Sequence, residues 1–273
     1  MIKKSLPFKA YTQMEGVNNS KLSLLRQCPQ KYIHFLDHNR EDTPALSLGR
    51  AIHTAVLEPE NFNKEFFCLP DLDRRTIKGR EEYNKLCAKN ADKTVLKADE
   101  FNKALEIATA VRSNSSVIKL LEGCEAEVSL DWVDHDTAIK CKARVDAYNE
   151  QLATIVDLKT TTDASSKGFP RKLFAYGYHR QAAFYLNGLR SNGLQARHFV
   201  FVAVEKDPPF AVGIYRLTDD VIALADKENT HLLRKLKACQ ESGEWPSYTA
   251  GIEDISIPTY AIDELEGAYG QSI

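Results

Sequence analysis

Residues 139–148 read IKCKARVDAY, and residues 154–160 read TIVDLKT. The first segment alternates strictly between apolar and polar residues, with Tyr148 in the polar set, which is typical of a strand with one buried face. The second segment is rich in β-branched residues and ends with Asp157 and Lys159 on the same face. The short connection between the segments fits a hairpin, which would bring Asp146 close to Asp157.

Two carboxylates that converge beside a lysine repel each other unless a further positive charge offsets them. Carboxylate oxygens are preferred ligands of hard divalent cations such as Mg²⁺ and Mn²⁺. Asp146, Asp157 and Lys159 are therefore candidates for a catalytic metal site. The alternative is a solvated hairpin with surface charges, because an Asp-x-Lys triplet alone is common.

The composition is that of an ordinary globular protein, with 273 residues, 43% hydrophobic and 27% charged. Its net charge of −2 gives no general attraction to nucleic acid, so a DNA-binding field would be local or built by assembly. The first seven residues lack the apolar core of a signal peptide, and no apolar run reaches membrane-spanning length. The six cysteines form no CxxC pair, which argues against a zinc site and disulfides. We expect a cytoplasmic protein with no membrane contact.

The rest of the chain alternates between helical and strand-like periodicity. Beyond an irregular lead-in over residues 1–17, helices are predicted near 20–36, 46–57, 80–90, 97–121, 173–190 and 217–239. Strands are predicted at 125–133, 139–148, 154–160, 198–206 and 210–217, the first three as an antiparallel meander. With no repeat or linker, residues 1–273 are interpreted as one domain, with a core over about 18–242 and an irregular tail at 243–273.

Several polar residues lie at spacings that suit phosphate or metal binding. Ser20, Ser23 and Arg26 share one face of the first helix, where they either hold a phosphate or cap and solvate the helix. His53 lies one turn from Arg50 and is either a metal ligand or a structural histidine. The positively charged loop at 70–80 is either an arch over the site or a solvated connection.

The combination of motifs resembles a known nuclease family. His53, Asp146, Asp157-Leu158-Lys159 and Gln181-x-x-x-Tyr185 follow the order found in the RecB-like branch of the PD-(D/E)XK superfamily. More narrowly, NSKLS at 19–23, LGRAIH at 48–53, KARVD at 142–146 and YHRQAAFY at 178–185 resemble the nuclease domain of the RecE type (exonuclease VIII). Such enzymes are encoded by phage and prophage recombination systems.

One departure excludes a cofactor. The segment Cys28-Pro29-x-x-Tyr32 resembles the opening motif of iron–sulfur RecB-like nucleases. Those enzymes need three more cysteines near the C-terminus, where this chain has only Cys239. We therefore expect no iron–sulfur cluster.

The resemblance implies an α/β fold with a restriction-endonuclease-like core, in which a central mixed β-sheet, made of the antiparallel meander plus further strands, is flanked by helices. It implies that Mg²⁺, for which Mn²⁺ can substitute, is held by His53, Asp146, Asp157 and the Leu158 carbonyl, with Glu127 a candidate for supporting a second ion. Lys159 would orient or deprotonate the attacking water and stabilise charge on phosphorus, while Gln181 and Tyr185 position the scissile strand. The candidate DNA- or phosphate-binding residues are Ser20, Ser23, Arg26, Arg50, Arg74, Arg75, Lys78 and Arg144.

The implied activity is a 5′-to-3′ double-stranded DNA exonuclease that leaves 3′ overhangs for a RecT-like single-strand annealing protein in a bacterial host cell. The resemblance also implies a ring-shaped homo-oligomer, for which we predict three or four subunits. Its axis would be lined by Lys140, Lys142 and Arg144 and by the charged loop at 70–80. The alternatives are a RecB-like nuclease that acts on single strands or flaps and a non-catalytic DNA-binding relative.

Overall fold

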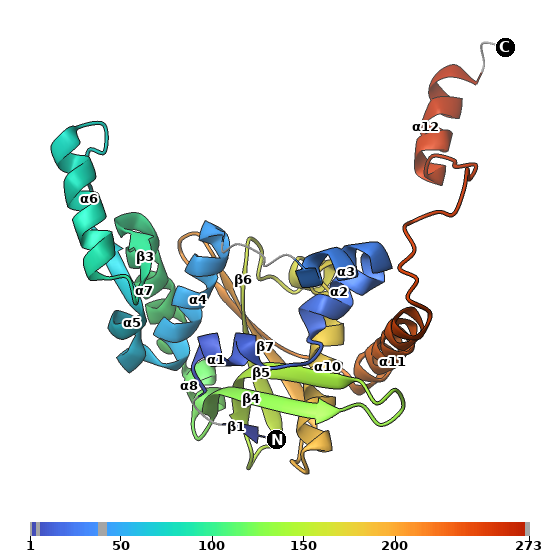
Figure 1. Ribbon diagram of the computed structural model, residues 1–273, viewed down its shortest axis with the longest axis horizontal. Coiled ribbons are helices and arrows are strands. Elements are labelled where there is room, and N and C mark those ends of the chain that lie inside the picture. Colours follow the sequence, from blue (N-terminus) through green and yellow to red (C-terminus); the bar gives the residue numbers. More distant parts are fainter. Residues whose placement is uncertain (1, 4–5, 38–42, 271–273) are drawn as a thin grey trace.

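The computed structural model describes residues 2–3, 6–37 and 43–270. Its centre is a six-stranded mixed sheet in the order β1-β4-β5-β6-β7-β8 (Figure 1). The strands are Ile2–Lys3, Glu125–Val133, Lys140–Asn149, Thr154–Thr161, His198–Glu205 and Val212–Arg216. Strands β4, β5 and β6 form the predicted antiparallel meander, and only the β6–β7 pair of this sheet is parallel in the described part of the chain.

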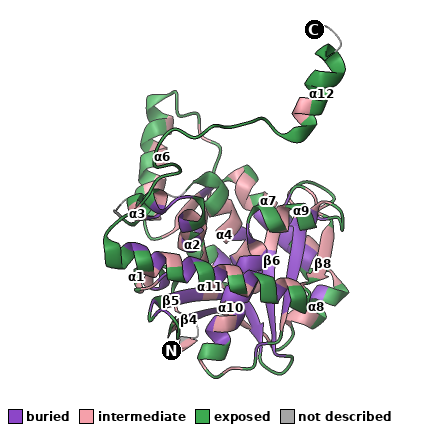
Figure 2. Ribbon diagram, turned by 90° about the vertical axis from the view of Figure 1, so that its right-hand side faces the viewer, coloured by how far each residue is buried: buried purple, intermediate pink, exposed green. Residues whose placement is uncertain are grey.

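Helices cover both faces of the sheet, so the predicted fold class is confirmed. One face packs against α9 (Phe169–Ala175), α10 (Tyr178–Ser191) and α11 (Asp219–Ser242). The other face packs against α4 (Pro44–Leu57), α7 (Ala98–Arg112) and α8 (Ser115–Leu121). The strands are accordingly the most buried part of the molecule, as Figure 2 shows.

The predicted strict alternation of β5 is wrong beyond Val145. Val145 and Tyr148 are three residues apart, yet both lie in the core beneath α10, whereas Ala147 lies in the core beneath α4. Tyr148 is therefore buried rather than part of a polar face. The change of side occurs at Asp146, which places this carboxylate at an irregular point of the sheet.

The amino-terminal residues are not an irregular lead-in, because they form a layer on the sheet. Strand β1 pairs with β4, and α1 (Phe8–Gln13) follows it. Helices α2 (Asn19–Gln27) and α3 (Pro29–Asp37) come next, and Asn18 caps α2 by accepting a 3.0 Å hydrogen bond from the backbone N–H of Lys21.

Two predicted helices are each broken in two. The helix expected at 97–121 ends at Arg112, because Asn114 caps α8 by accepting hydrogen bonds from the N–H groups of Ser116 and Val117. The helix expected at 173–190 is interrupted at Gly177, whose φ of 70° is open to glycine at little cost.

Two segments project from the body. A small parallel sheet of β2 (Phe66–Leu69) and β3 (Thr94–Lys97), with α5 (Pro59–Glu65), supports α6 (Ile77–Lys89), which stands away from the main sheet (Figure 1). At the other end, the predicted irregular tail contains the helix α12 (Thr259–Tyr269). Within the described residues, none of the helices combines the length and apolar character that a membrane span needs.

Candidate active site

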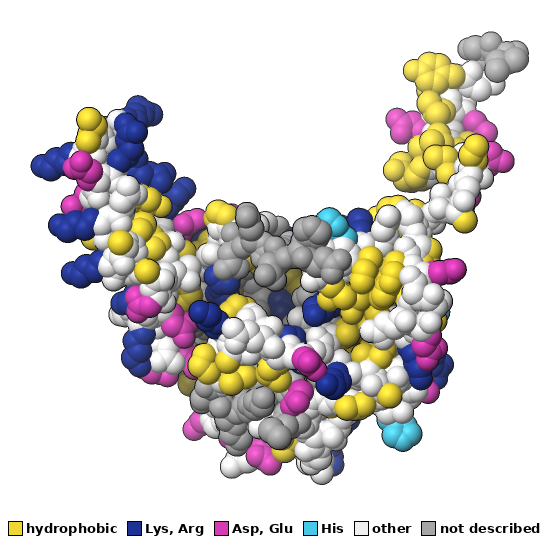
Figure 3. All heavy atoms as spheres, viewed as in Figure 1, with side chains coloured by type: hydrophobic (Ala, Val, Ile, Leu, Met, Phe, Trp, Pro, Cys, Tyr) yellow, Lys and Arg dark blue, Asp and Glu magenta, His cyan; other side chains and the backbone are white. Residues whose placement is uncertain are grey.

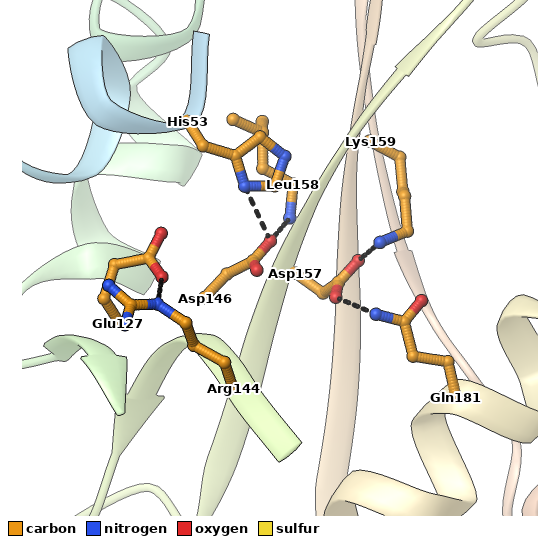
Figure 4. A network of polar contacts seen from close by, with 8 residues as sticks. All are labelled: His53, Glu127, Arg144, Asp146, Asp157, Leu158, Lys159 and Gln181. Atoms are coloured by element: carbon orange, nitrogen blue, oxygen red, sulfur yellow. Dashed lines mark hydrogen bonds and ion pairs between the residues drawn. The ribbon is translucent and has the colours of Figure 1, made fainter. Parts of the chain in front are cut away.

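Asp146 lies at the centre of a polar cluster built from β4, β5, β6 and α4 (Figure 4). Its Oδ2 accepts a 2.9 Å hydrogen bond from the backbone N–H of Leu158 and lies 3.3 Å from Nδ1 of His53. The last pair of the β5–β6 ladder is Ala147 with Val156, so the two strands separate where Asp146 begins. The Asp146 carboxylate thus takes the place of a backbone carbonyl as the acceptor for the Leu158 N–H. This hydrogen bond fixes how far β5 and β6 separate at this point.

His53, Glu127 and Asp146 each offer one ligand atom, and the three atoms lie within 4.8 Å of one another. Burial lowers the pKa of His53, which keeps its imidazole neutral and able to coordinate. Burial also raises the pKa of Glu127 and of Asp146, because each carboxylate has lost solvent. A divalent cation would relieve this cost, so one nitrogen and two carboxylate oxygens form a donor set that fits such an ion.

Asp157 is fully buried beside this cluster, on the neighbouring strand. One of its oxygens forms an ion pair with Lys159, and Oδ2 accepts a 3.2 Å hydrogen bond from Nε2 of Gln181. Burial nevertheless raises the pKa of Asp157 to about 6, and the nearby charge of Asp146 adds to the effect. Both oxygens of Asp157 thus have partners within the protein, and Asp157 is not one of the three residues whose ligand atoms lie together. Its pKa still responds to the charge of Asp146.

Lys159 is held as a charged ammonium. Burial opposes the charged form, but Asp157 and Asp146 outweigh it and raise the pKa of Lys159. The aromatic ring of Tyr178 lies 4.8 Å from the ammonium nitrogen, a cation–π arrangement. Tyr178 opens the motif at 178–185 and shares one face of α10 with Gln181, a stripe that the sequence favours as a packed face; its contact with Lys159 was not predicted.

Gln181 and Tyr185 are brought together with the acidic residues, as the motif requires. Tyr185 lies one helical turn beyond Gln181, and burial raises the pKa of Tyr185 well above its usual value. The side-chain amide of Gln181 is held by Asp157, whose Oδ2 accepts its 3.2 Å hydrogen bond.

Arg144 points into the protein and is not exposed as a DNA contact would be. Its Nε forms an ion pair with Glu127, and its Nη1 donates a 2.5 Å hydrogen bond to the carbonyl of Leu6. The guanidinium also lies 5.9 Å from the ring of Phe8. Arg144 thus positions Glu127, an arrangement that depends on the amino-terminal layer.

The predicted basic stripe on β5 does not exist as a surface. Lys142 is buried, and its ammonium donates to the backbone carbonyls of Tyr11, Thr12 and Met14 at 2.6–3.1 Å. Lys140 instead forms an exposed ion pair with Glu15. These lysines fasten the amino-terminal layer to the sheet, so they are unsuited to line a DNA channel.

The three residues of α2 that are candidates for phosphate binding have different surroundings in the structure. Ser20 is exposed, and Ser23 donates a 2.9 Å hydrogen bond to the carbonyl of Asn19 in its own helix. Arg26 donates to Glu228 of α11 at 2.6 Å. A phosphate would therefore have to compete with Glu228 for Arg26.

The remaining candidate DNA contacts lie in two different places, one on α4 and the others around the start of α6. Arg50 of α4 lies over the ring of Phe8. Arg74, Arg75 and Lys78 are exposed at the start of the projecting α6, where basic side chains are conspicuous in Figure 3. The loop at 70–80 belongs to this projection, and its contact with DNA stays a prediction.

A family model described as a "PDDEXK-like domain of unknown function (DUF3799)" matches residues 18–256. Among solved structures, one from Eubacterium rectale described as a "Putative exonuclease" is 18% identical, with a TM-score of 0.62 over 97% of this chain and 100% of that chain. Lower TM-scores are found for SSO0001 (0.32; 17% identity; 78% and 84% covered) and for protein VC1899 from Vibrio cholerae (0.22; 13%; 82% and 58%). No curated protein matches the sequence.

Proposed function

Because this chain belongs to the family of PDDEXK-like domains, we propose that it is a divalent-metal-dependent nuclease that degrades duplex DNA from its ends. The observation that carries the proposal is the buried cluster of His53, Glu127 and Asp146 next to the Asp157–Lys159 ion pair. Buried acidic clusters with raised pKa values are costly to a fold, and they concentrate at functional sites. The likeness to a structure described as an exonuclease agrees with this function.

The proposed roles follow from the contacts. His53, Glu127 and Asp146 would hold the cation, with Asp157 and the Leu158 carbonyl close by as the resemblance implies. A bound divalent cation supplies charge neutralisation and lowers the pKa of water. Lys159, already charged, is suited to stabilise the negative charge that develops on the phosphate oxygens. Gln181 orients Asp157, and Arg144 orients Glu127.

For the substrate, we propose duplex ends processed from 5′ to 3′ in the manner of RecE-type enzymes, giving 3′ overhangs for a RecT-like partner. The resemblance of the sequence motifs supports this choice over single strands or flaps. Several copies around one duplex would explain how a chain of net charge −2 stays bound during many cycles.

End-labelled linear duplexes, with and without a 5′ phosphate, test the proposal in Mg²⁺ and in EDTA. We expect metal-dependent release of the 5′ label before the 3′ label, and no release by the Asp146→Asn variant. Preferred digestion of single strands or flaps would support the RecB-like alternative. Digestion that continues in excess EDTA would overturn the metal-dependent mechanism.

A further inference from the structure

The carboxy-terminal segment at residues 246–270, here named the tail, follows α11 and extends away from the body (Figure 1). Only its first residues contact α3 among the described residues, where the carbonyl of Pro246 accepts a 3.3 Å hydrogen bond from the backbone N–H of Gln30 and the ring of Tyr248 lies 5.5 Å from the ammonium of Lys31. Ile252 and Ile255 are 103% and 92% exposed, and Tyr260 and Tyr269 are largely exposed too. No residue of α12 is buried, and Figure 2 shows this helix as almost entirely exposed. An isolated helix of 11 residues is marginal in water, so a partner would stabilise it.

The tail is also strongly acidic. It contains no lysine or arginine, and its acidic residues are Glu253, Asp254, Asp263, Glu264 and Glu266. A partner surface should therefore be basic and should offer room for an apolar or aromatic side chain.

A surface of this kind exists at the opposite end of the same molecule. The arm, defined as residues 71–89, comprises α6 and the loop before it, and no residue of α6 is buried. Its basic residues, which outnumber its four acidic ones, are Arg74, Arg75, Lys78, Arg80, Lys85 and Lys89. Dark blue side chains dominate the arm in Figure 3, whereas the tail is yellow and magenta.

The arm also contains a hollow. Its volume is about 1030 Å³, and its lining combines three arginines and Tyr83 with two acidic residues, namely Arg74, Arg75, Arg80, Tyr83, Asp71 and Asp73. The guanidinium of Arg74 lies 4.9 Å from the ring of Tyr83. A tyrosine or isoleucine of the tail could enter this hollow while the arginines face the acidic side chains of α12.

The two surfaces cannot meet within one molecule as it is folded. The arm and the tail rise on the same side of the body but from its two opposite ends (Figure 1). A second copy of the chain can supply the missing partner. Such a contact joins two different surfaces, so repeating it gives a closed ring or an open chain of copies.

We propose that the tail of one copy docks on the basic arm of a second copy and thereby joins subunits head to tail. This inference does not depend on nuclease activity, because the contact is made by residues outside the acidic cluster. It reassigns Arg74 and Arg75 from a direct DNA contact to a subunit contact.

Charge reversal tests the contact in the full-length protein. The arm-reversed variant carries R74E, R75E and R80E, and the tail-reversed variant carries D263K, E264K and E266K. Light scattering coupled to gel filtration should show an oligomer for the wild type and, for each variant, a dissociation constant raised at least about tenfold. A matched control, E106K, changes an exposed acid on α7 and should leave the mass unchanged.

Mixing the two variants gives the sharper test. The reversed tail, which is now basic, should bind the unreversed basic arm only poorly, but it fits the reversed, acidic arm of the other protein. An equimolar mixture should therefore assemble, although neither variant does so alone. Circular dichroism of each variant should lose no more helix than the 11 residues of α12, which shows that the body stays folded, because the changed residues are exposed.

Other outcomes would overturn the proposal. A wild type that stays monomeric at tens of micromolar would do so, as would an oligomer that survives both reversals. Variants that dissociate but fail to assemble on mixing would show that the arm and tail do not bind each other. If the arm-reversed variant stayed oligomeric and lost only DNA binding, the arm would be a DNA contact and the tail would serve a different protein.

Discussion

Glu127 stands opposite Asp146 in the register of β4 and β5, but it leaves the ladder with a φ of 53°. The pairs on either side are Ala126 with Ala147 and Val128 with Val145. A non-glycine residue in this region costs on the order of 1 kcal/mol and persists only where its surroundings impose it. Here the irregular backbone brings the carboxylates of Glu127 and Asp146 onto one side of the sheet, next to His53.

The first prediction concerns Asp146. Asp146→Asn should abolish metal-dependent cleavage and weaken metal binding, while the fold persists because an amide oxygen can still accept the hydrogen bond from Leu158. Calorimetric titration with Mn²⁺ and a cleavage assay measure the two effects. Asp136→Asn, at an exposed ion pair with Arg234, serves as the control. Wild-type turnover in Asp146→Asn would remove this residue from the site.

Lys159 should act mainly on turnover. Lys159→Ala removes a cation that is positioned to stabilise developing negative charge, so kcat should fall by roughly 10²- to 10³-fold while KM changes little. Steady-state kinetics on a labelled duplex separate the two constants. A variant with normal kcat and raised KM would show instead that Lys159 anchors the bound phosphate.

Tyr178 should tune the same lysine through its ring. Tyr178→Phe keeps the aromatic face beside the ammonium and should retain most of the activity. Tyr178→Leu removes the cation–π contact and should lower kcat about two- to thirtyfold, as expected for a contact of 0.5–2 kcal/mol. Equal kinetics for the Phe and Leu variants would argue that the ring only fills space.

The buried Asp157 predicts a pH dependence of stability in metal-free buffer. Its pKa is raised from 3.8 to about 6, chiefly by burial, so the folded state holds the proton more tightly than the unfolded chain. The stabilising contribution is therefore complete below pH 3.8 and is lost as the pH rises through 6. Denaturant unfolding between pH 4 and pH 8 should increasingly favour the permanently neutral Asp157→Asn over the wild type.

The test depends on how the difference in unfolding free energy between Asp157→Asn and the wild type changes with pH. A shift that runs the other way, in favour of the wild type as the pH rises, would mean that Lys159 stabilises the ionised carboxylate more than burial destabilises it. Asp136→Asn should show little change over the same range, because the Arg234 hydrogen bond lowers the pKa of Asp136.

Arg26 provides a test of end selection. If a terminal phosphate displaces Glu228 from Arg26, then Arg26→Ala should remove most of any preference for 5′-phosphorylated ends. Competition assays with phosphorylated and unphosphorylated duplexes measure this preference. An unchanged preference would leave Arg26 as a structural link between α2 and α11, and Arg50 would become the next candidate.

Local sequence was sufficient to predict the meander and the residues that it brings together. Asp146, Asp157 and Lys159 could be placed because strand periodicity and a short hairpin restrict which side chains can meet. The fold class and the PD-(D/E)XK superfamily followed from the same motifs, and both are confirmed, whereas the resemblance to the RecE type stays a prediction. The roles of the individual site residues stay predictions that the variants above can decide.

Other features were decided only by packing between distant segments. The stripe of Lys140, Lys142 and Arg144 reads as a basic surface, but the amino-terminal layer covers β5 and supplies the carbonyls that bind Lys142 and Arg144. Strand periodicity shows which residues share a face, and it does not show which distant segment will cover that face. Tyr178 meets Lys159 for the same reason, because α10 packs on the sheet at that position.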